Sequence, residues 1–158
     1  MEALCSPDPC DGSPGVPYER SLCTGFLAGR TEGLPPGFYL LDREGTSLGQ
    51  AASGDFPDRM TRICLDQAWL SQAAVLFLFI TDLAALDKSW GPRGYRYAMM
   101  TAGRLGERLY VAATAVGLGC CGIGALYDGE AARLLGLQGL SRLLYLVGIG
   151  PVKGGGIS

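Results

Sequence analysis

The sequence has 158 residues, of which 48% are hydrophobic and 18% are charged, so the chain can bury a core and is not a disordered segment. A domain of this length buries roughly 70% of the surface of its unfolded chain. The net charge of −2 argues against the broad basic surface that duplex DNA binding requires, and we predict no nucleic-acid partner.

The charge is unevenly distributed along the chain. Residues 1–87 hold twelve acidic and five basic side chains, whereas residues 88–158 hold three acidic and eight basic ones. Five of these bases fall between Lys88 and Arg108. This local cluster suits a phosphate-bearing small molecule, and a solvated basic surface explains it equally well.

Histidine is absent, which excludes Ser-His-Asp and Cys-His nucleophile systems and zinc sites built on histidine. We predict no metal site. The sequence contains six cysteines. Residues 1–15 do not resemble a signal peptide, because they are acidic and proline-rich and lack an apolar centre. The apolar run at residues 73–80 is far shorter than the ~20 residues that cross a bilayer. We therefore predict a cytoplasmic chain with reduced cysteines and no membrane contact.

The first third of the chain predicts a tail followed by short strands. Residues 1–18 are rich in Pro, Gly, Cys and Asp and predict an irregular segment. Short strands are expected at residues 22–28 and 38–41. A reverse turn at residues 42–45 then predicts a hairpin.

The middle of the chain predicts a helix from Asp55 to about Ser71, with Asp55 or Asp58 as its cap. The apolar run 73–80 then reads as a strand buried on both faces. A short helix is expected from Thr81, as its cap, to Asp87, followed by a loop from Lys88 to Arg96.

The strongest periodic element is a helix at about residues 98–116, which Gly117 ends. Its predicted apolar stripe consists of Leu105, Leu109, Ala112, Ala113 and Val116. The glycine-rich segment 117–124 follows the helix. By itself this segment is either a tight connection or a place where backbone N–H groups approach a flat or anionic ligand.

The remaining elements are a helix from Asp128, as its cap, to Leu135 and a buried strand at residues 142–148. The last residues, from Gly150, are mostly glycine. The order of elements is mixed α and β, without an internal repeat.

Several segments occur in a specific order. They are Glu32-Gly-Leu-Pro-Pro-Gly-Phe-Tyr39, the strand ending at Thr81-Asp82, Gly91-Pro-Arg-Gly-Tyr-Arg-Tyr-Ala98, Gly117-Leu-Gly-Cys-Cys-Gly-Ile-Gly124, Leu135-Gly-Leu137 and Leu143-Leu-Tyr-Leu-Val-Gly148. This series resembles the nitroreductase-like flavoproteins over about residues 30–150, and in particular their SagB-type dehydrogenase branch.

The resemblance implies an α+β nitroreductase-like fold, with a central mixed sheet flanked by helices and one long central helix. It places the domain at residues 19–153, between the tail 1–18 and a glycine-rich tail at 154–158. Members of the family are FMN enzymes that pass electrons, often from NAD(P)H, to a small-molecule acceptor. They form homodimers with the flavins at the interface.

The resemblance also implies site residues. Gly122, Ile123 and Gly124 match the segment whose backbone lies against the flavin ring, where the N–H of Gly124 is expected to donate to flavin N5. Cys121 lies beside this segment and is expected to pack against the ring, with a redox-active thiol at Cys120 or Cys121 as the alternative. The candidates for a phosphate site are Arg93, Arg96 and Lys153, and Ser13 is carried over with Gly15 from a turn motif of the family as a further cofactor-binding candidate. Arg93 and Arg96 could equally anchor their loop. No catalytic side chain is assigned.

The chain departs from the family pattern at two places, and three hypotheses about its function remain open. The family's amino-terminal helix, with its basic residues for the FMN phosphate, has no counterpart, which indicates an amino-terminally shortened domain. Ser89-Trp90 stands where azoline oxidases carry Lys-Tyr. The chain is then an FMN-dependent oxidoreductase, a non-catalytic relative that acts as a binding or scaffold subunit, or an enzyme whose missing helix comes from a second chain.

Overall fold

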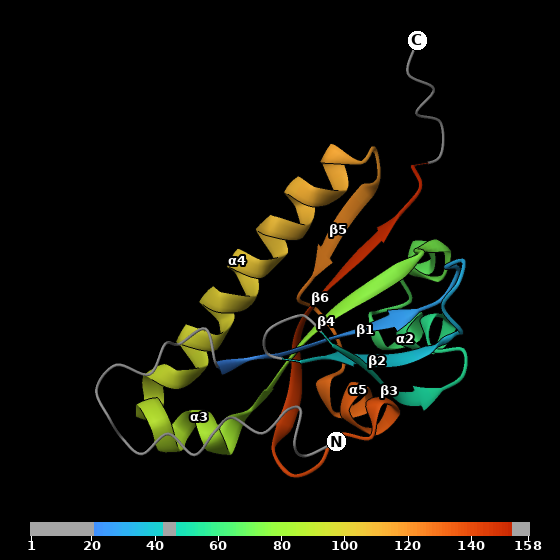
Figure 1. The fold of residues 1–158 in the computed structure, drawn as a ribbon. Helices are drawn as coiled ribbons and strands as arrows, with labels where there is room; N and C mark the ends of the chain where they lie inside the picture. The colour runs from blue at the N-terminus through green and yellow to red at the C-terminus, as the bar shows by residue number, and fades with distance from the viewer. Residues whose placement is uncertain (1–20, 43–46, 153–158) are drawn as a thin grey trace.

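The computed structural model describes residues 21–42 and 47–152. The predicted tails at 1–18 and 154–158, and the predicted turn at 42–45 apart from Asp42, lie outside these residues. The described strands form one six-stranded sheet in the order β3-β2-β1-β4-β6-β5, with helices on both faces (Figure 1). Every pairing in this sheet is antiparallel. The α+β class is therefore confirmed.

The strands are β1 (Cys23–Ala28), β2 (Gly37–Leu41), β3 (Leu48–Ser53), β4 (Val75–Asp82), β5 (Gly119–Ile123) and β6 (Ser141–Gly150). The helices are α2 (Pro57–Ile63), α3 (Leu83–Trp90), α4 (Gly94–Ala115) and α5 (Asp128–Leu135), with short 3₁₀ helices η2 (Ala68–Gln72) and η3 (Gly91–Arg93). The predicted strands at 22–28, 38–41, 73–80 and 142–148 and the β2–β3 hairpin are confirmed. No described helix combines the length and hydropathy needed to cross a bilayer.

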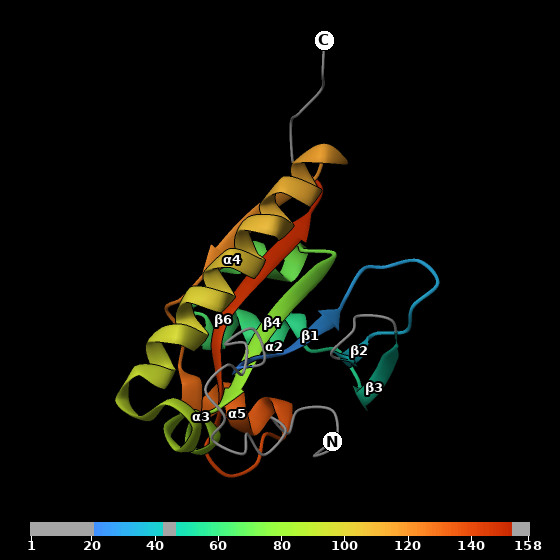
Figure 2. The ribbon, with the colours of Figure 1, turned by 60° about the vertical axis from the view of Figure 1, so that its left-hand side comes forward.

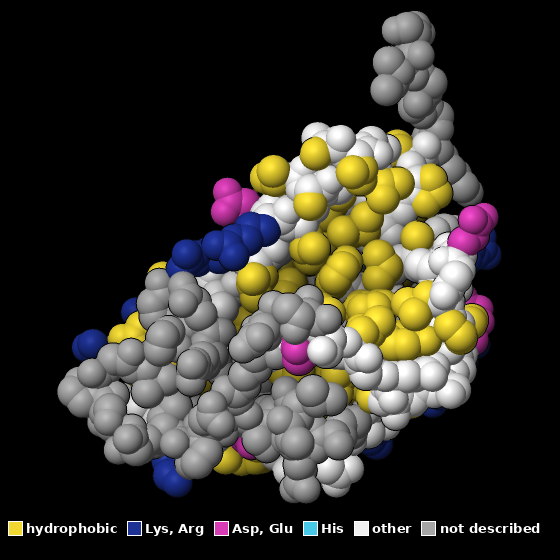
Figure 3. Space-filling view, viewed as in Figure 1, with side chains coloured by type: hydrophobic (Ala, Val, Ile, Leu, Met, Phe, Trp, Pro, Cys, Tyr) yellow, Lys and Arg dark blue, Asp and Glu magenta, His cyan; other side chains and the backbone are white. Residues whose placement is uncertain are grey.

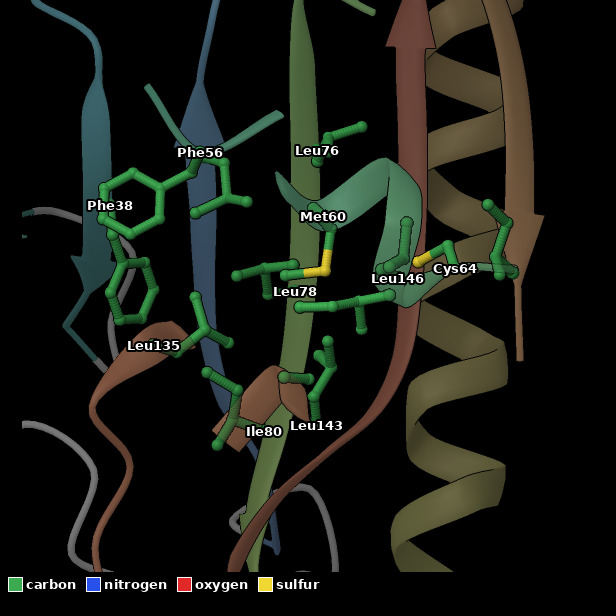
Figure 4. Packing of buried hydrophobic residues seen from close by; sticks show 14 of the residues in the cluster. Phe38, Phe56, Met60, Cys64, Leu76, Leu78, Ile80, Leu135, Leu143 and Leu146 are labelled. Atoms are coloured by element: carbon green, nitrogen blue, oxygen red, sulfur yellow. The ribbon is translucent and has the colours of Figure 1, made fainter. Parts of the chain in front are cut away.

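The side chains of β4 alternate between the two faces of the sheet, as the period of two in a strand requires. Leu76, Leu78 and Ile80 point to the face that α2 and α5 cover, where they meet Met60 and Leu146. Figure 4 shows this packing, and Figure 2 shows α4 along the opposite face. Both faces of β4 are thus apolar, which explains its continuous hydrophobic run.

The opposite face of the sheet is only partly covered. Helix α4 packs on β6 and β5 through a cluster that includes Phe79 and Val147. Farther along the sheet, Phe26 is half-buried and stacks on Tyr39, with ring centroids 5.3 Å apart. Hydrophobic side chains gather beside α4 in the space-filling view (Figure 3). An apolar surface therefore continues from α4 onto the sheet.

The single helix predicted at 55–71 is wrong, because the chain breaks between α2 and η2. Leu65 and Asp66 adopt left-handed backbone angles, with φ of 59° and 56°. These angles reverse the chain, so that both α2 and η2 contribute apolar side chains to one core. Helix α2 begins after Phe56 without a side-chain cap, so neither Asp55 nor Asp58 has the predicted role.

The predicted helix cap at Thr81 is also wrong. Thr81 is the buried seventh residue of β4, and its hydroxyl donates to the Ser21 carbonyl at 2.6 Å. Asp82 caps α3 instead, because its carboxylate accepts the N–H groups of Ala84 and Ala85 at 2.8 and 3.3 Å. The predicted loop at 88–96 is replaced by the end of α3, by η3 and by the first turn of α4.

The predicted helix ending at Leu135 is confirmed, but Asp128 is its first residue rather than its cap. Tyr127 precedes the helix and provides no side-chain cap. The Asp128 carboxylate accepts the neighbouring N–H of Gly129 at 2.8 Å, so it serves one local donor only.

Helix α4 has 22 residues and ends at Ala115, two residues before Gly117, whose φ of 72° is the left-handed angle that favours glycine. The predicted apolar stripe is divided. Ala113 is buried and Leu109 half-buried against the sheet, whereas Ala112 and Val116 are exposed. The stripe is therefore wider than the face that the sheet covers.

The prediction that the cysteines are reduced is wrong at Cys23, which is disulfide-bonded. Cys64, Cys120 and Cys121 are free thiols. Cys64 lies fully inside the core between the sheet and α2.

Burial raises the pKa of the Cys64 thiol from 9.0 to about 11. The folded state therefore resists ionisation of this thiol, while the unfolded chain ionises it from pH 9 upward. We expect this group's contribution to stability to be complete below pH 9 and to be lost as the pH rises toward 11. Urea unfolding of the wild type and Cys64→Ala across this range measures the difference, and parallel curves would contradict the expectation.

Candidate functional site

The glycine-rich segment forms an edge strand of the described sheet and is not a tight connection, which was one of the two alternatives that the sequence left open. After Gly117 the chain reverses, and β5 pairs with β6 from Gly119↔Gly150 to Ile123↔Leu146. Ile123 is 4% exposed and lies in the core shared with α2 and α5. Its side chain thus anchors the strand, and only its backbone is available to a ligand.

The free edge of β5 carries backbone donors. In an antiparallel edge strand, alternate residues direct their N–H groups into the sheet or away from it. The N–H of Gly122 points away and donates to the Tyr110 hydroxyl of α4 at 2.7 Å. Gly124 directly follows the strand, is exposed, and has no hydrogen-bond partner among the described residues. One backbone donor beside this edge is therefore available.

Tyr145 of β6 fills the space between α4 and β5. Its ring stacks on Phe79, with centroids 6.0 Å apart. A Cβ atom at Gly106 of α4 would lie 2.8 Å from Tyr145 Cε1. A Cβ atom at Gly122 would overlap the Tyr145 hydroxyl. Two glycines, from a helix and from a strand, thus make room for one aromatic ring.

The site is neutral around Tyr145. Burial raises the pKa of the Tyr145 phenol, and the nearby Tyr110, Cys120 and Cys121 raise it further. Burial, followed by the charge of Cys121, also raises the pKa of the Cys120 thiol. Both groups stay protonated at neutral pH, so neither Tyr145 nor Cys120 supplies an anionic nucleophile. The described residues contain no group of His, Cys, Asp and Glu arranged to hold a metal ion.

The structure brings some of the predicted site residues together. Cys121, Gly122, Ile123 and Gly124 are consecutive along β5 and its end, with Cys121 exposed. No pattern in the sequence singles out Tyr110, and Tyr145 belongs there only to a strand motif. The signal that could have revealed this contact is the pair of glycines Gly106 and Gly122. A glycine inside a helix or a strand often marks the close approach of another residue.

The arginines are far from this segment within one chain. Arg93 and Arg96 are exposed at the start of α4. Tyr110 is fourteen residues after Arg96, which corresponds to about 21 Å along the helix axis. Ser13 and Lys153 lie outside the described residues.

The nitroreductase family model matches residues 43–151, so the chain belongs to this family. A protein of Methanocaldococcus jannaschii that is named as a nitroreductase is 27% identical over 146 residues, which are 85% of this chain and 74% of that protein.

Solved structures agree with the predicted nitroreductase-like fold. A nitroreductase from Anabaena variabilis matches with a TM-score of 0.80 and 30% identity over 84% of this chain. The Escherichia coli microcin synthetase McbBCD complex matches with a TM-score of 0.69 and 20% identity over 96% of this chain. The chain spans 27% of the first protein and 60% of the second. The nitroreductase-like fold is thereby confirmed.

The Tyr145 contacts predict different effects of adding a methyl group at the two glycines. Gly122→Ala places a Cβ against the Tyr145 hydroxyl, and overpacking of this kind lowers the free energy of unfolding by about 1–3 kcal/mol. Gly124→Ala is the matched control, because its Cβ would lie 4.0 Å from the nearest atom, Tyr145 Cδ2. Urea unfolding of both variants measures the effect. Equal stabilities would show that Tyr145 does not occupy this position.

Proposed function

We propose that the chain is an FMN-dependent oxidoreductase that binds the flavin at the edge of β5. The observation that supports this most directly is the backbone donor of Gly124, which is exposed and has no hydrogen-bond partner among the described residues. The family resemblance assigns the same N–H to flavin N5. An unpaired donor at a strand edge is a suitable contact for a ring nitrogen.

The surroundings of Gly124 fit a flat ring. The nearest atom to a Cβ at this position would be Tyr145 Cδ2, at 4.0 Å, so there is open space on that side of the backbone. Apolar side chains gather beside α4 over this face of the sheet (Figure 3). The raised pKa of Tyr145 keeps its phenol uncharged, which adds no negative charge near the ring.

Bound FMN would supply hydride transfer between NAD(P)H or a small-molecule substrate and an acceptor. The residues of this chain would bind and orient it. Gly124 would hold one ring edge through its N–H, while Ile123, fixed in the core, keeps the strand in place. The N–H of Gly122 already donates to the Tyr110 hydroxyl, so the N–H of Gly124 is the donor that remains for the flavin.

We propose further that two copies pair through α4. The last turns of this helix expose apolar side chains that the sheet does not cover, with Val111 at 65% and Val116 at 69% exposure. Two-fold pairing of antiparallel helices would bring the start of one α4 beside the end of the other. Arg93 and Arg96 of one copy would then approach the β5 edge of its partner, where they could bind a phosphate.

The proposed flavin contact is tested with Gly124→Val. A side chain here would point into the space that the ring needs, so we expect this variant to lose bound flavin and turnover with NAD(P)H. It should remain folded, because no atom lies closer than 4.0 Å to the added Cβ. Visible absorbance of protein reconstituted with FMN, together with circular dichroism, measures both. Ala125→Val, one residue later, is the control.

If Gly124→Val binds as much flavin per chain as the wild type, Gly124 does not contact the flavin ring. If neither the wild type nor Ala125→Val binds FMN at millimolar concentration, the chain is instead a non-catalytic member of the family.

The dimer is tested with Val111→Glu. Because Val111 is exposed, the substitution should leave the stability of one chain nearly unchanged while it places a charge in the proposed interface. Light scattering at micromolar concentration should show a dimer for the wild type and a monomer for the variant. A monomeric wild-type protein would contradict the proposal.

A further inference from the structure

A recess lies where β5 begins and β6 ends, at the other end of β5 from Gly124. Its volume is about 600 Å³, within the usual range of small-molecule sites. Helix η2, both strands and Arg30, which follows β1 by two residues, form its walls. Most of the described residues that line it are small or apolar, and none of them is acidic. The recess can therefore bury an apolar molecule and does not repel an anion.

Trp69 supplies an aromatic surface to this recess. A Cβ atom at Gly148 of β6 would lie 3.1 Å from Cζ3 of the Trp69 indole, so the ring rests on the bare backbone of the strand. The residue nevertheless remains 40% exposed. An indole fixed on one side and open on another is a suitable surface for stacking.

Arg30 supplies the positive charge. Its Nη1 donates to Gln72 Oε1 at 3.0 Å, which fixes the guanidinium at the wall of the recess. Gln72 is a neutral partner, and no carboxylate pairs with Arg30 among the described residues. The guanidinium still has donors that can bind a carboxylate with two parallel hydrogen bonds.

We propose that this recess binds a small planar aromatic carboxylate, with its ring on Trp69 and its carboxylate on Arg30. The arrangement combines an apolar cavity with one aromatic surface and one fixed cation, the pattern of a specific small-molecule site. The proposal does not depend on the flavin contact at Gly124, because Arg30 and Trp69 line the recess and Gly124 does not, although Cys121 lines the recess and is also a flavin candidate. It assigns the chain a second ligand.

Calorimetric titration with 2-naphthoate tests the proposal. We expect saturable binding to the wild type and about tenfold or greater weakening in Arg30→Gln, which loses the charge-assisted contact. Trp69→Leu should weaken binding as well. Arg59→Gln is the matched control, because Arg59 is equally exposed but lies on α2, outside this recess. Neutral 2-naphthamide should bind more weakly than the acid.

Two further measurements distinguish binding in this recess from binding of the flavin. Gly124→Val should bind 2-naphthoate as the wild type does, whether or not it binds FMN. In a Trp90→Phe variant Trp69 is the remaining tryptophan, so its emission should change on titration. No binding at millimolar 2-naphthoate, equal binding of the amide, or unchanged affinity in both Arg30→Gln and Trp69→Leu would overturn the proposal.

Discussion

The ring of Tyr145 sets the distance between α4 and the edge of the sheet. It stacks on Phe79 within the sheet and fills the space that Gly106 and Gly122 leave open. Protein interiors are close-packed, so neither glycine can accept a side chain unless the tyrosine moves. The position of β5 relative to the helix, and with it the chemistry of the strand edge, depends on this contact.

The same contact explains why one edge strand presents two different donors. Tyr110 lies one helical turn after Gly106, close enough to accept the N–H of Gly122 at 2.7 Å. The N–H of Gly124, two residues later, has no hydrogen-bond partner among the described residues. Because Ile123 is held in the core on the other face, the strand end is fixed while its outer edge remains open. A rigid backbone donor of this kind is what a planar cofactor or substrate requires.

Local patterns predicted most of the elements correctly, and the errors share a cause. The alternation in β4, the length of α4 and the stop at Gly117 depend on neighbouring residues, so the sequence reveals them. The break at Leu65 and Asp66 depends on two segments that must reach one core from different directions. The cap at Asp82 rather than Thr81 depends on a hydrogen bond from Thr81 to Ser21, sixty residues away.

The candidate site divides in the same way. By itself the sequence determined the glycine-rich segment, its order among the family motifs and the absence of histidine chemistry. Only the tertiary structure decided that this segment is an edge strand, that Gly122 makes room for Tyr145, and that Arg93 and Arg96 lie far from it in one chain. The physical reason is that these features come from contacts among α4, β5 and β6. Their partners are distant along the chain, and no pattern of neighbouring residues encodes which of them meet.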